Sequence, residues 1–386
     1  MSANKWRLPH GVNELLPPAA AALESLRRAV LDLFRVWGYE HVEPPLVEYL
    51  DALLVGSGAD LDLQTMKVVD QQSGRLLGVR ADMTSQAVRV DSHSRKVNGV
   101  QRLCYAGAVV HANPRGALDG RIIFKAGAEL FGSDARAADA EVVRLMLEAL
   151  RVAGVDDPVL MLGHTGVFRA LVSGLTMDGS VSRQLFDAVQ RKSESDIAAL
   201  VRVHGAPEAL VTLPTLMGGE DVLDAAARQL GDAFPGILDA LAELKEVVAR
   251  VRAEYPGVVI RFDLGELSGY GYHNGLVFAA FQADQGAAIA QGGRYDGIGA
   301  HFGRARPATG FDMDLGRLLR AGALPAAIWA PVDEGDGTLR RRVSELRNGG
   351  EVVVQALDKG DIAPQMCVQE LVKDGNNWVL RARHGV

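Results

Sequence analysis

The sequence has little of what marks a nucleic-acid-binding or membrane protein. Its 41 lysine and arginine residues are outnumbered by 48 aspartate and glutamate residues, for a formal net charge of −7. Because lysine and arginine supply most of the affinity for a phosphate backbone, this balance argues against a nucleic-acid partner. No segment approaches the roughly 20 apolar residues that cross a membrane, and the first residues lack the apolar core of a signal peptide. We therefore expect a cytoplasmic protein without membrane contact.

Cysteine is also scarce, and Cys104 and Cys367 lie far apart in the chain. A disulfide framework or a structural metal site needs more numerous or more closely spaced cysteines. We expect two free, buried thiols, no metal and no cofactor.

What the sequence does contain is an alternation of helical and strand patterns. With 386 residues, 48% of them hydrophobic, the chain is long enough for two or three domains with a large core. By themselves these patterns establish only an α+β protein. Helices are predicted over about 23–37, 84–94, 134–150 and 339–346, and strands over 76–80, 158–163, 258–262, 276–281, 287–291 and 351–357. The segment 310–319 is predicted to begin as a strand and end as a helix.

Two stretches depart from this alternation. Residues of about 165–255 are mostly helical and carry a long apolar stripe that begins at Ile237. We interpret them as a helical insertion into one core of residues 1–325. Residues 326–386 differ in composition and hold a predicted hairpin turn at Gly375. We interpret them as a small C-terminal α/β appendage.

The most informative stretch, residues 102–132, has the pattern of two long antiparallel strands. It resembles the second signature motif of class II aminoacyl-tRNA synthetases, in the histidyl version. Five segments follow the order of that family's core, and the last includes a Gly-Gly-Arg-Tyr-Asp-Gly turn at Arg294. The segments are 39–49, 76–90, 102–132, 263–281 and 291–319.

The resemblance implies the class II fold, an antiparallel sheet of six or seven strands flanked by helices. It also implies a homodimeric core, whose interface in that family is built by the first motif, here residues 39–49. The alternative for this segment alone is a helix, loop and strand of no special meaning.

Two departures from the family affect the chemistry most. His111 stands where the hairpin carries an arginine that holds the α-phosphate of ATP and the amino acid's carboxylate. Ser268 stands where the histidyl family has its own catalytic arginine. A neutral imidazole cannot make the bidentate contacts of a guanidinium. Losing one such transition-state contact commonly costs roughly 10²–10³ in rate, so we expect no amino-acid adenylation and no catalytic residue.

Three arginines of the synthetase motifs remain, Arg121, Arg294 and Arg317. The resemblance implies that Arg317 matches the third-motif arginine that packs on ATP. The alternative is that all three form structural salt bridges inside a retained scaffold. The sequence leaves both interpretations open.

Three acidic or hydroxyl residues fall on the family's pocket for the ligand ammonium. Asp82 and Thr84 match a glutamate and a threonine that hold the α-amino group of histidine, and Glu129 matches a glutamate that faces the same pocket. Such acceptors suit an ammonium, because they replace its hydration shell. For Asp82 and Thr84 the alternative is a helix cap.

Three more residues complete the pocket that the resemblance implies. Tyr272 and His273 fall on a tyrosine pair that lines the imidazole side, and Lys125 replaces a glutamine near the ligand's carboxylate. The alternatives are core packing for the aromatic pair and a solvated strand residue for Lys125. We predict that these six residues bind histidine.

The end of the chain separates it from the synthetases. Residues 326–386 are too few for the anticodon-binding domain with which that family ends, and they carry no basic run. The chain is therefore more similar to the regulatory subunits of ATP phosphoribosyltransferase, the first enzyme of histidine biosynthesis. This resemblance implies a short-form catalytic subunit as partner, a homodimeric core within a hetero-octamer, feedback inhibition by histidine, and no tRNA.

Two other functions remain open at this point. One is a histidyl-tRNA synthetase or a histidine-adenylating enzyme, which His111, Ser268 and the short tail disfavour. The other is a purely architectural subunit whose pocket is vestigial. Pyrophosphate exchange tests the first, and calorimetry with free histidine tests the second.

Overall fold

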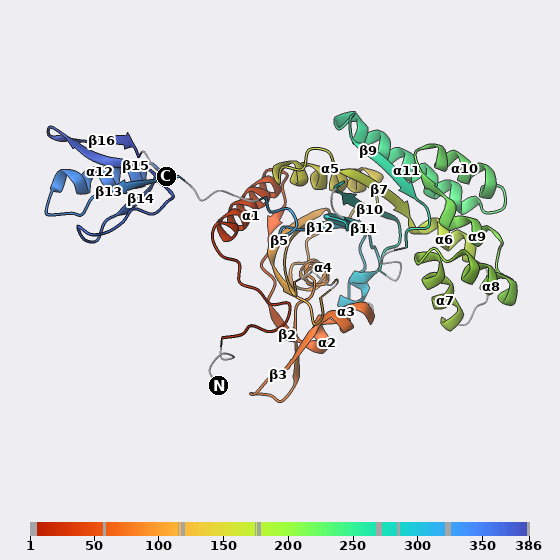
Figure 1. The fold of residues 1–386 in the computed structure, drawn as a ribbon. Helices are drawn as coiled ribbons and strands as arrows, with labels where there is room; N and C mark the ends of the chain where they lie inside the picture. The colour runs from red at the N-terminus through yellow and green to blue at the C-terminus, as the bar shows by residue number, and fades with distance from the viewer. Residues whose placement is uncertain are drawn as a thin grey trace. The chain divides into compact units, whose positions relative to one another are not determined.

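The computed structural model describes residues 6–56, 59–114, 116, 120–173, 175, 179–267, 272–283, 286–320 and 326–383 (Figure 1). The chain divides into two compact units. One comprises Met1–Glu14 and Leu23–Leu319, and the other comprises Leu15–Ala22 and Arg320–Val386. Helices and sheets are mixed in both, which confirms the α+β prediction.

A nine-stranded sheet organises the larger unit. Its pairings are antiparallel except for the two parallel pairs at β1 with β5 and at β7 with β9. Six or seven strands are expected from the class II resemblance, and the larger number arises from two-residue strands at the two edges, β1 and β8. From one edge to the other the strands are β1 (Glu40–His41), β5 (Gln101–Val110), β6 (Ile122–Phe131), β12 (Ala308–Asp314), β11 (Ala290–Arg294), β10 (Leu276–Phe281), β7 (Val159–His164), β9 (Val259–Asp263) and β8 (Met217–Gly218).

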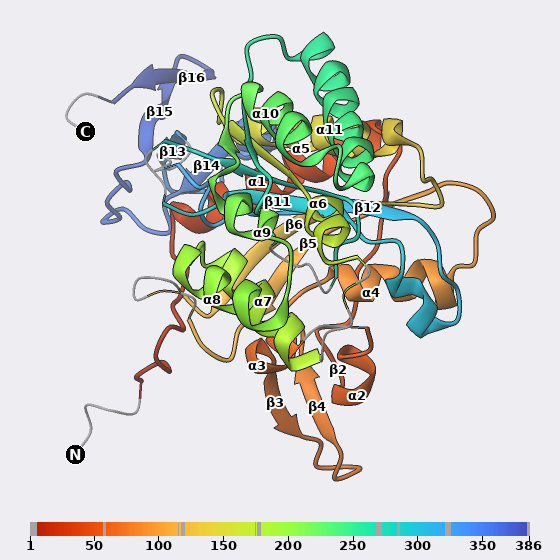
Figure 2. The same ribbon diagram turned by 90° about the vertical axis from the view of Figure 1, so that its right-hand side faces the viewer.

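Three helices cover one face of this sheet (Figure 2). They are α1 (Ala19–Val36), α5 (Arg136–Val152) and α11 (Pro235–Glu254). Phe34 of α1 meets Phe311 of β12 edge to face, with ring centroids 5.9 Å apart. Because side chains alternate along a strand, Gly310 and Asp312 point to the opposite face. That opposite face carries the candidate site.

Helices fill most of the chain between β7 and β9. The apolar stripe of α11 is buried, from Ile237 to Val251. The two-residue strand β8 interrupts the helical pattern and pairs with β9. The remaining elements of this segment are α6 (Thr165–Val172), α7 (Gly179–Gln190), α8 (Glu194–His204), α9 (Ala209–Thr212), the 3-10 helix η2 (Leu213–Thr215) and α10 (Asp221–Leu230).

A separate three-stranded sheet, in the order β2-β4-β3, projects from the larger unit (Figure 2). After this sheet the chain forms α4, which continues as a π-helix, η1. A single α-helix is predicted for these residues. The elements are β2 (Val47–Tyr49), α2 (Leu50–Leu53), α3 (Ala59–Gln64), β3 (Met66–Val69), β4 (Leu76–Val79), α4 (Thr84–Arg89), η1 (Val90–Ser94) and the 3-10 helix η3 (Ile298–Phe302).

Two predicted elements differ from the structure. The strand predicted over 287–291 begins at Ala290 and extends to Arg294, because Gly292 and Gly293 pair with both neighbouring strands. The helix predicted after β12 is a turn. There Asp314 Oδ1 accepts the backbone N–H of Gly316 at 2.9 Å, and such side-chain bonds compete with helix formation.

The smaller unit has a four-stranded sheet in the order β14-β13-β15-β16. β13 lies parallel to both of its neighbours, and β15 and β16 form the predicted hairpin. Gly375 turns this hairpin with a φ of 59°, a left-handed conformation that suits glycine. The elements are β13 (Ala327–Ala330), α12 (Gly337–Asn348), β14 (Val352–Gln355), β15 (Cys367–Asp374) and β16 (Asn377–Ala382).

Candidate ligand-binding site

A row of glycines hollows the open face of the nine-stranded sheet. Gly163, Val277, Gly293, Gly310 and Glu129 lie opposite one another on five successive strands. Three of these five positions have no side chain. The space above them is part of a cavity of about 440 Å³.

Neighbouring side chains lie directly on two of these glycines. A Cβ on Gly293 would lie 2.8 Å from Cδ2 of His273, and a Cβ on Gly310 would overlap Oε2 of Glu129. Glycine is therefore required at both positions for His273 and Glu129 to enter the cavity. The sheet itself thus brings these two predicted site residues together.

The carboxyl group of Glu129 is held by two tyrosines. It accepts hydrogen bonds from the hydroxyl of Tyr105 at 2.9 Å and from the hydroxyl of Tyr295. Burial raises the pKa of Glu129 to about 8, although the two tyrosine hydrogen bonds act in the opposite direction. Near pH 7 this group is mostly protonated, so it is a neutral hydrogen-bonding group and not the anionic acceptor expected from the sequence.

Asp82 and Lys125 form an ion cluster with Asp312, which the sequence argument does not name. Lys125 Nζ lies 2.9 Å from Asp82 Oδ2 and 3.0 Å from Asp312 Oδ2. Burial opposes ionisation of Asp82, but the charge and hydrogen bond of Lys125 outweigh it and lower the pKa. Asp82 and Asp312 line the cavity.

Thr84 connects the ion cluster to Glu129. Its backbone N–H donates to Asp82 Oδ1 at 2.7 Å, as expected of an aspartate near a helix N-terminus, and its hydroxyl lies 3.1 Å from that of Tyr105. The hydrogen bond from the Thr84 backbone to Asp82 is of the kind that the helix-cap alternative predicts. It does not remove Asp82 or Thr84 from the cavity wall, because both line it.

Tyr272 and His273 lie at the other side of the cavity. Their rings meet edge to face with centroids 5.4 Å apart, and the Tyr272 ring lies 5.0 Å from that of Tyr295. Among the described residues, no hydrogen-bond partner is found for the buried hydroxyl of Tyr272. A buried hydroxyl in this state is a candidate contact for a ligand.

Several cavity residues were not predicted from the sequence. Gln64 of α3, Gln291 of β11 and Glu266 add polar groups to the wall. Asp312 could have been predicted from the alternation of side chains along β12, since it lies two residues from Gly310 and hence on the same face. The segment containing Gln64 has no such signal, because it reaches the cavity only through the tertiary fold.

His111 does not replace an arginine in the cavity wall. Its side chain is buried, and Nε2 lies 3.2 Å from the backbone oxygen of Ala81. It is not among the lining residues. Ser268, the other predicted departure, lies outside the described residues.

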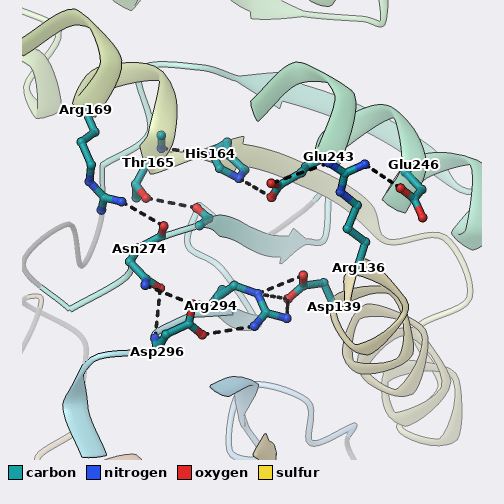
Figure 3. Close-up of polar contacts among 12 residues, drawn as sticks. Arg136, Asp139, His164, Thr165, Arg169, Glu243, Glu246, Asn274, Arg294 and Asp296 are labelled. Atoms are coloured by element: carbon teal, nitrogen blue, oxygen red, sulfur yellow. Dashed lines mark hydrogen bonds and ion pairs between the residues drawn. The ribbon is translucent and has the colours of Figure 1, made fainter. Parts of the chain in front are cut away.

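The three retained arginines also lie outside the cavity wall. Arg294 is buried between Asp139, whose oxygens it meets at 2.9–3.1 Å, and Asp296 (Figure 3). Arg121 Nε donates to the backbone oxygen of His111 at 3.0 Å, and Arg317 Nε lies 3.5 Å from a carboxylate oxygen of Asp314. Of the three, Arg294 has the contacts of a buried structural residue.

The described part of the chain lacks the features of a metal site and of a membrane-spanning helix. Within it, no group of three or more histidine, cysteine, aspartate or glutamate side chains is arranged to hold a metal ion. Both cysteines are unpaired and buried. None of the described helices has the length and apolar character needed to cross a membrane.

Comparison with known proteins shows the family of this chain. Residues 11–318 match the family described as histidyl-tRNA synthetase, and residues 325–381 match the ATP phosphoribosyltransferase subunit HisZ C-terminal domain. The ATP phosphoribosyltransferase regulatory subunit of Pseudomonas syringae pv. tomato is 47% identical, over 98% of each chain. That of Pseudomonas putida is 46% identical, also over 98% of each chain.

Solved structures agree with these matches. A Bacillus halodurans protein described as an ATP phosphoribosyltransferase regulatory subunit/histidyl-tRNA synthetase has a TM-score of 0.81 at 25% identity, covering 94% of this chain and 95% of that one. A histidyl-tRNA synthetase from Nostoc sp. PCC 7120 has a TM-score of 0.76 at 17% identity, over 98% of this chain and 97% of that one, which shows a shared class II fold. On the sequence identity and coverage of its relatives, the chain belongs to the family of ATP phosphoribosyltransferase regulatory subunits.

Proposed function

We propose that this chain is a regulatory subunit that makes and breaks no covalent bond itself. It activates a short-form ATP phosphoribosyltransferase catalytic subunit in histidine biosynthesis, and it binds histidine to mediate feedback inhibition of the complex. Family membership supports the regulatory role. The composition of the cavity supports histidine as the ligand.

The observation that carries the proposal is the charge of the cavity wall. Among the described residues, the wall contains the carboxyl groups of Asp82, Glu266 and Asp312 and the mostly protonated Glu129, but no lysine or arginine. An adenylate phosphate needs cationic donors that neutralise its charge, and a wall of carboxyl groups repels it. The same wall suits a ligand that carries an ammonium.

The polar groups of the cavity divide into two sets that match the two ends of histidine. Asp82, Thr84 and Asp312 offer acceptors to the ammonium. On the imidazole side, a protonated Glu129 donates to an unprotonated ring nitrogen, and the Tyr272 hydroxyl offers a second hydrogen bond. His273 packs beside the imidazole ring of the ligand. Lys125 lies behind Asp82 and contributes through its charge.

An exposed apolar cluster supports a homodimeric core. It lies on the three-stranded sheet and the adjoining helix α3, next to the segment that resembles the first class II motif. Apolar side chains gathered on one small sheet in this way mark a protein interface. We propose that two chains pair here, within a hetero-octamer that includes the catalytic subunit. The exposed residues are Val47, Tyr49 and Val68 on one face of this sheet, Val69 and Leu76 on its other face, and Leu46 and Leu63 next to the sheet.

The organisation of the chain follows from the same proposal. Residues 1–325 form the class II core, with a helical insertion at about 165–255, and residues 326–386 replace an anticodon-binding domain. The net charge of −7 supports a protein that binds no tRNA. We propose that it acts in the cytoplasm.

The test is an activity assay on a reconstituted complex. The chain is mixed with the short-form catalytic subunit from the same genome, complex formation is confirmed by sedimentation, and phosphoribosyl transfer to ATP is followed. The rate should rise on mixing, and histidine should reverse the gain, because a ligand shifts activity through its differential affinity for two states. Unchanged rates in a confirmed complex would contradict the proposal.

A variant separates the regulatory role from an architectural one. Asp82→Asn should still activate the catalytic subunit, while its response to histidine should be weakened. Activation by the wild type without any histidine response would favour an architectural subunit with a vestigial cavity.

A further inference from the structure

The ammonium of Lys125 lies between two carboxylates at the edge of the cavity. Its distances to Asp82 Oδ2 and Asp312 Oδ2 are 2.9 Å and 3.0 Å. The Lys125 side chain is only 4% exposed, whereas those of Asp82 and Asp312 are 23% and 16% exposed. The carboxylates therefore face the cavity. The ammonium lies behind them, and its charge contributes to the electrostatic field in the cavity.

The charges of this cluster do not cancel. Asp82 and Asp312 supply two negative charges and Lys125 supplies one positive charge, so one negative charge remains. Glu129 adds little to this total near neutral pH, because burial raises its pKa to about 8. The cluster can balance one ligand ammonium.

Without Lys125 the balance would be different. Two neighbouring carboxylates would then face the cavity without the cation that lies between them. Such a pair attracts any ammonium strongly and repels a ligand carboxylate, and these interactions are stronger in a partly dehydrated site than in water. A site of that kind would favour amines over amino acids.

We propose that Lys125 determines the ligand class of the cavity by selecting zwitterionic α-amino acids over amines that carry the same ring. It does so through the charge of the cluster, since Lys125 itself is not among the lining residues. This inference rests on the proposed function, namely that the cavity binds a histidine-like ligand. It also explains why a ligand carboxylate can bind beside two aspartates.

The test compares L-histidine with histamine, which differs from it by the missing carboxylate. Both are titrated by calorimetry into the wild type and Lys125→Gln, with a thermal melt of each chain. The wild type should prefer histidine. Lys125→Gln should shift the affinity ratio toward histamine by roughly tenfold or more, because one positive charge is lost beside the ligand.

Two further variants control this result. Lys125→Gln combined with Asp312→Asn restores the net charge of the cluster and should return the ratio toward that of the wild type. Lys245→Gln removes a lysine that pairs with Asp224 at 2.8 Å outside the cavity wall, and it should leave the ratio unchanged. If Lys125→Gln alone does not fold, Asp312→Asn alone keeps the test informative, because it makes the cluster neutral and should shift the ratio away from histamine.

The outcomes distinguish this inference from the proposed function. A wild-type ratio in Lys125→Gln, or a ratio in the double variant that stays at the Lys125→Gln value, with both ligands bound, would overturn the role of Lys125 and leave the histidine site intact. Binding of neither ligand by the folded wild type would overturn the histidine site, and this inference with it.

Discussion

Two buried ion clusters lie on the nine-stranded sheet, and they differ in what surrounds them. Arg294 is 7% exposed and Asp139 is 4% exposed, and the guanidinium also donates to the backbone oxygen of Ser133 and to Asp296. Protein groups thus surround its charge on several sides. This cluster has no side chain in the cavity wall.

The cluster around Lys125 is open by comparison. Each cluster has one cation for two carboxylates, but only in the Lys125 cluster do both carboxylates, Asp82 and Asp312, face the cavity. A closed cluster holds secondary structure together, because breaking it leaves a buried charge without compensation. An open cluster with excess charge can take a ligand as an additional partner. Buried ionic residues of one sheet can therefore serve stability in one place and recognition in another.

Breaking the closed cluster should have the largest effect. Arg294→Met leaves Asp139 buried without its cation, so the free energy of unfolding should fall by about 3–5 kcal/mol. Urea unfolding measures this loss. Arg250→Met, which removes an exposed partner of Glu246, should change it by less than about 1 kcal/mol. A loss of histidine affinity in folded Arg294→Met would contradict the assignment of Arg294 to structure.

Breaking the open cluster should affect binding more than folding. Asp82→Asn removes one carboxylate from the proposed ammonium site and should weaken histidine binding by about 2–3 kcal/mol. Calorimetry beside a thermal melt measures both quantities. Asp224→Asn, at an exposed pair with Lys245, serves as the control. Normal binding together with a lowered melting temperature would remove Asp82 from the site.

The pH dependence of stability tests the state of Glu129. Its pKa is raised from 4.5 to about 8, so this group stabilises the fold fully below about pH 4.5 and the contribution is lost as the pH rises through about 8. Between these limits the wild type should lose stability relative to Glu129→Gln by roughly 1.4 kcal/mol per pH unit. Urea unfolding of both chains at about pH 6 and about pH 8 measures this difference. Parallel profiles would contradict a proton on Glu129.

The smallest expected effect is an absence of catalysis. Histidine-dependent pyrophosphate exchange should not exceed the no-enzyme blank, because no arginine of the described residues reaches the cavity wall. His111→Arg should not restore it, since His111 lies against the Ala81 carbonyl and outside the wall. Exchange above the blank in the wild type would contradict the non-catalytic role.

The sequence predicts the long elements of this fold well, for a physical reason. The hairpin of β5 and β6 agrees with the predicted stretch 102–132 to within a residue at each end, because long strands of apolar residues carry a strong pattern. The strand β11 was displaced, because Gly292 and Gly293 favour a turn until two neighbouring strands pair with them. Pairing with the two neighbouring strands outweighs the local preference of these glycines for a turn.

The site is less accessible to sequence reasoning. Asp312 meets Lys125 across 187 positions of the chain, and only the register of β6 with β12 brings them together. The proton on Glu129 depends on burial and on Tyr105 and Tyr295, which no local pattern reveals. The resemblance to a known family named the pocket residues. Their charges and partners required the structure.

The central claim is that the open cluster forms part of a histidine site and the closed cluster does not. Calorimetry of the wild-type chain with L-histidine, repeated on Asp82→Asn and on Arg294→Lys, tests it most directly. We predict saturable binding of histidine at one site per chain, weakened in Asp82→Asn and preserved in folded Arg294→Lys. No heat of binding in the folded wild type, or equal affinity in wild type and Asp82→Asn, would contradict the claim.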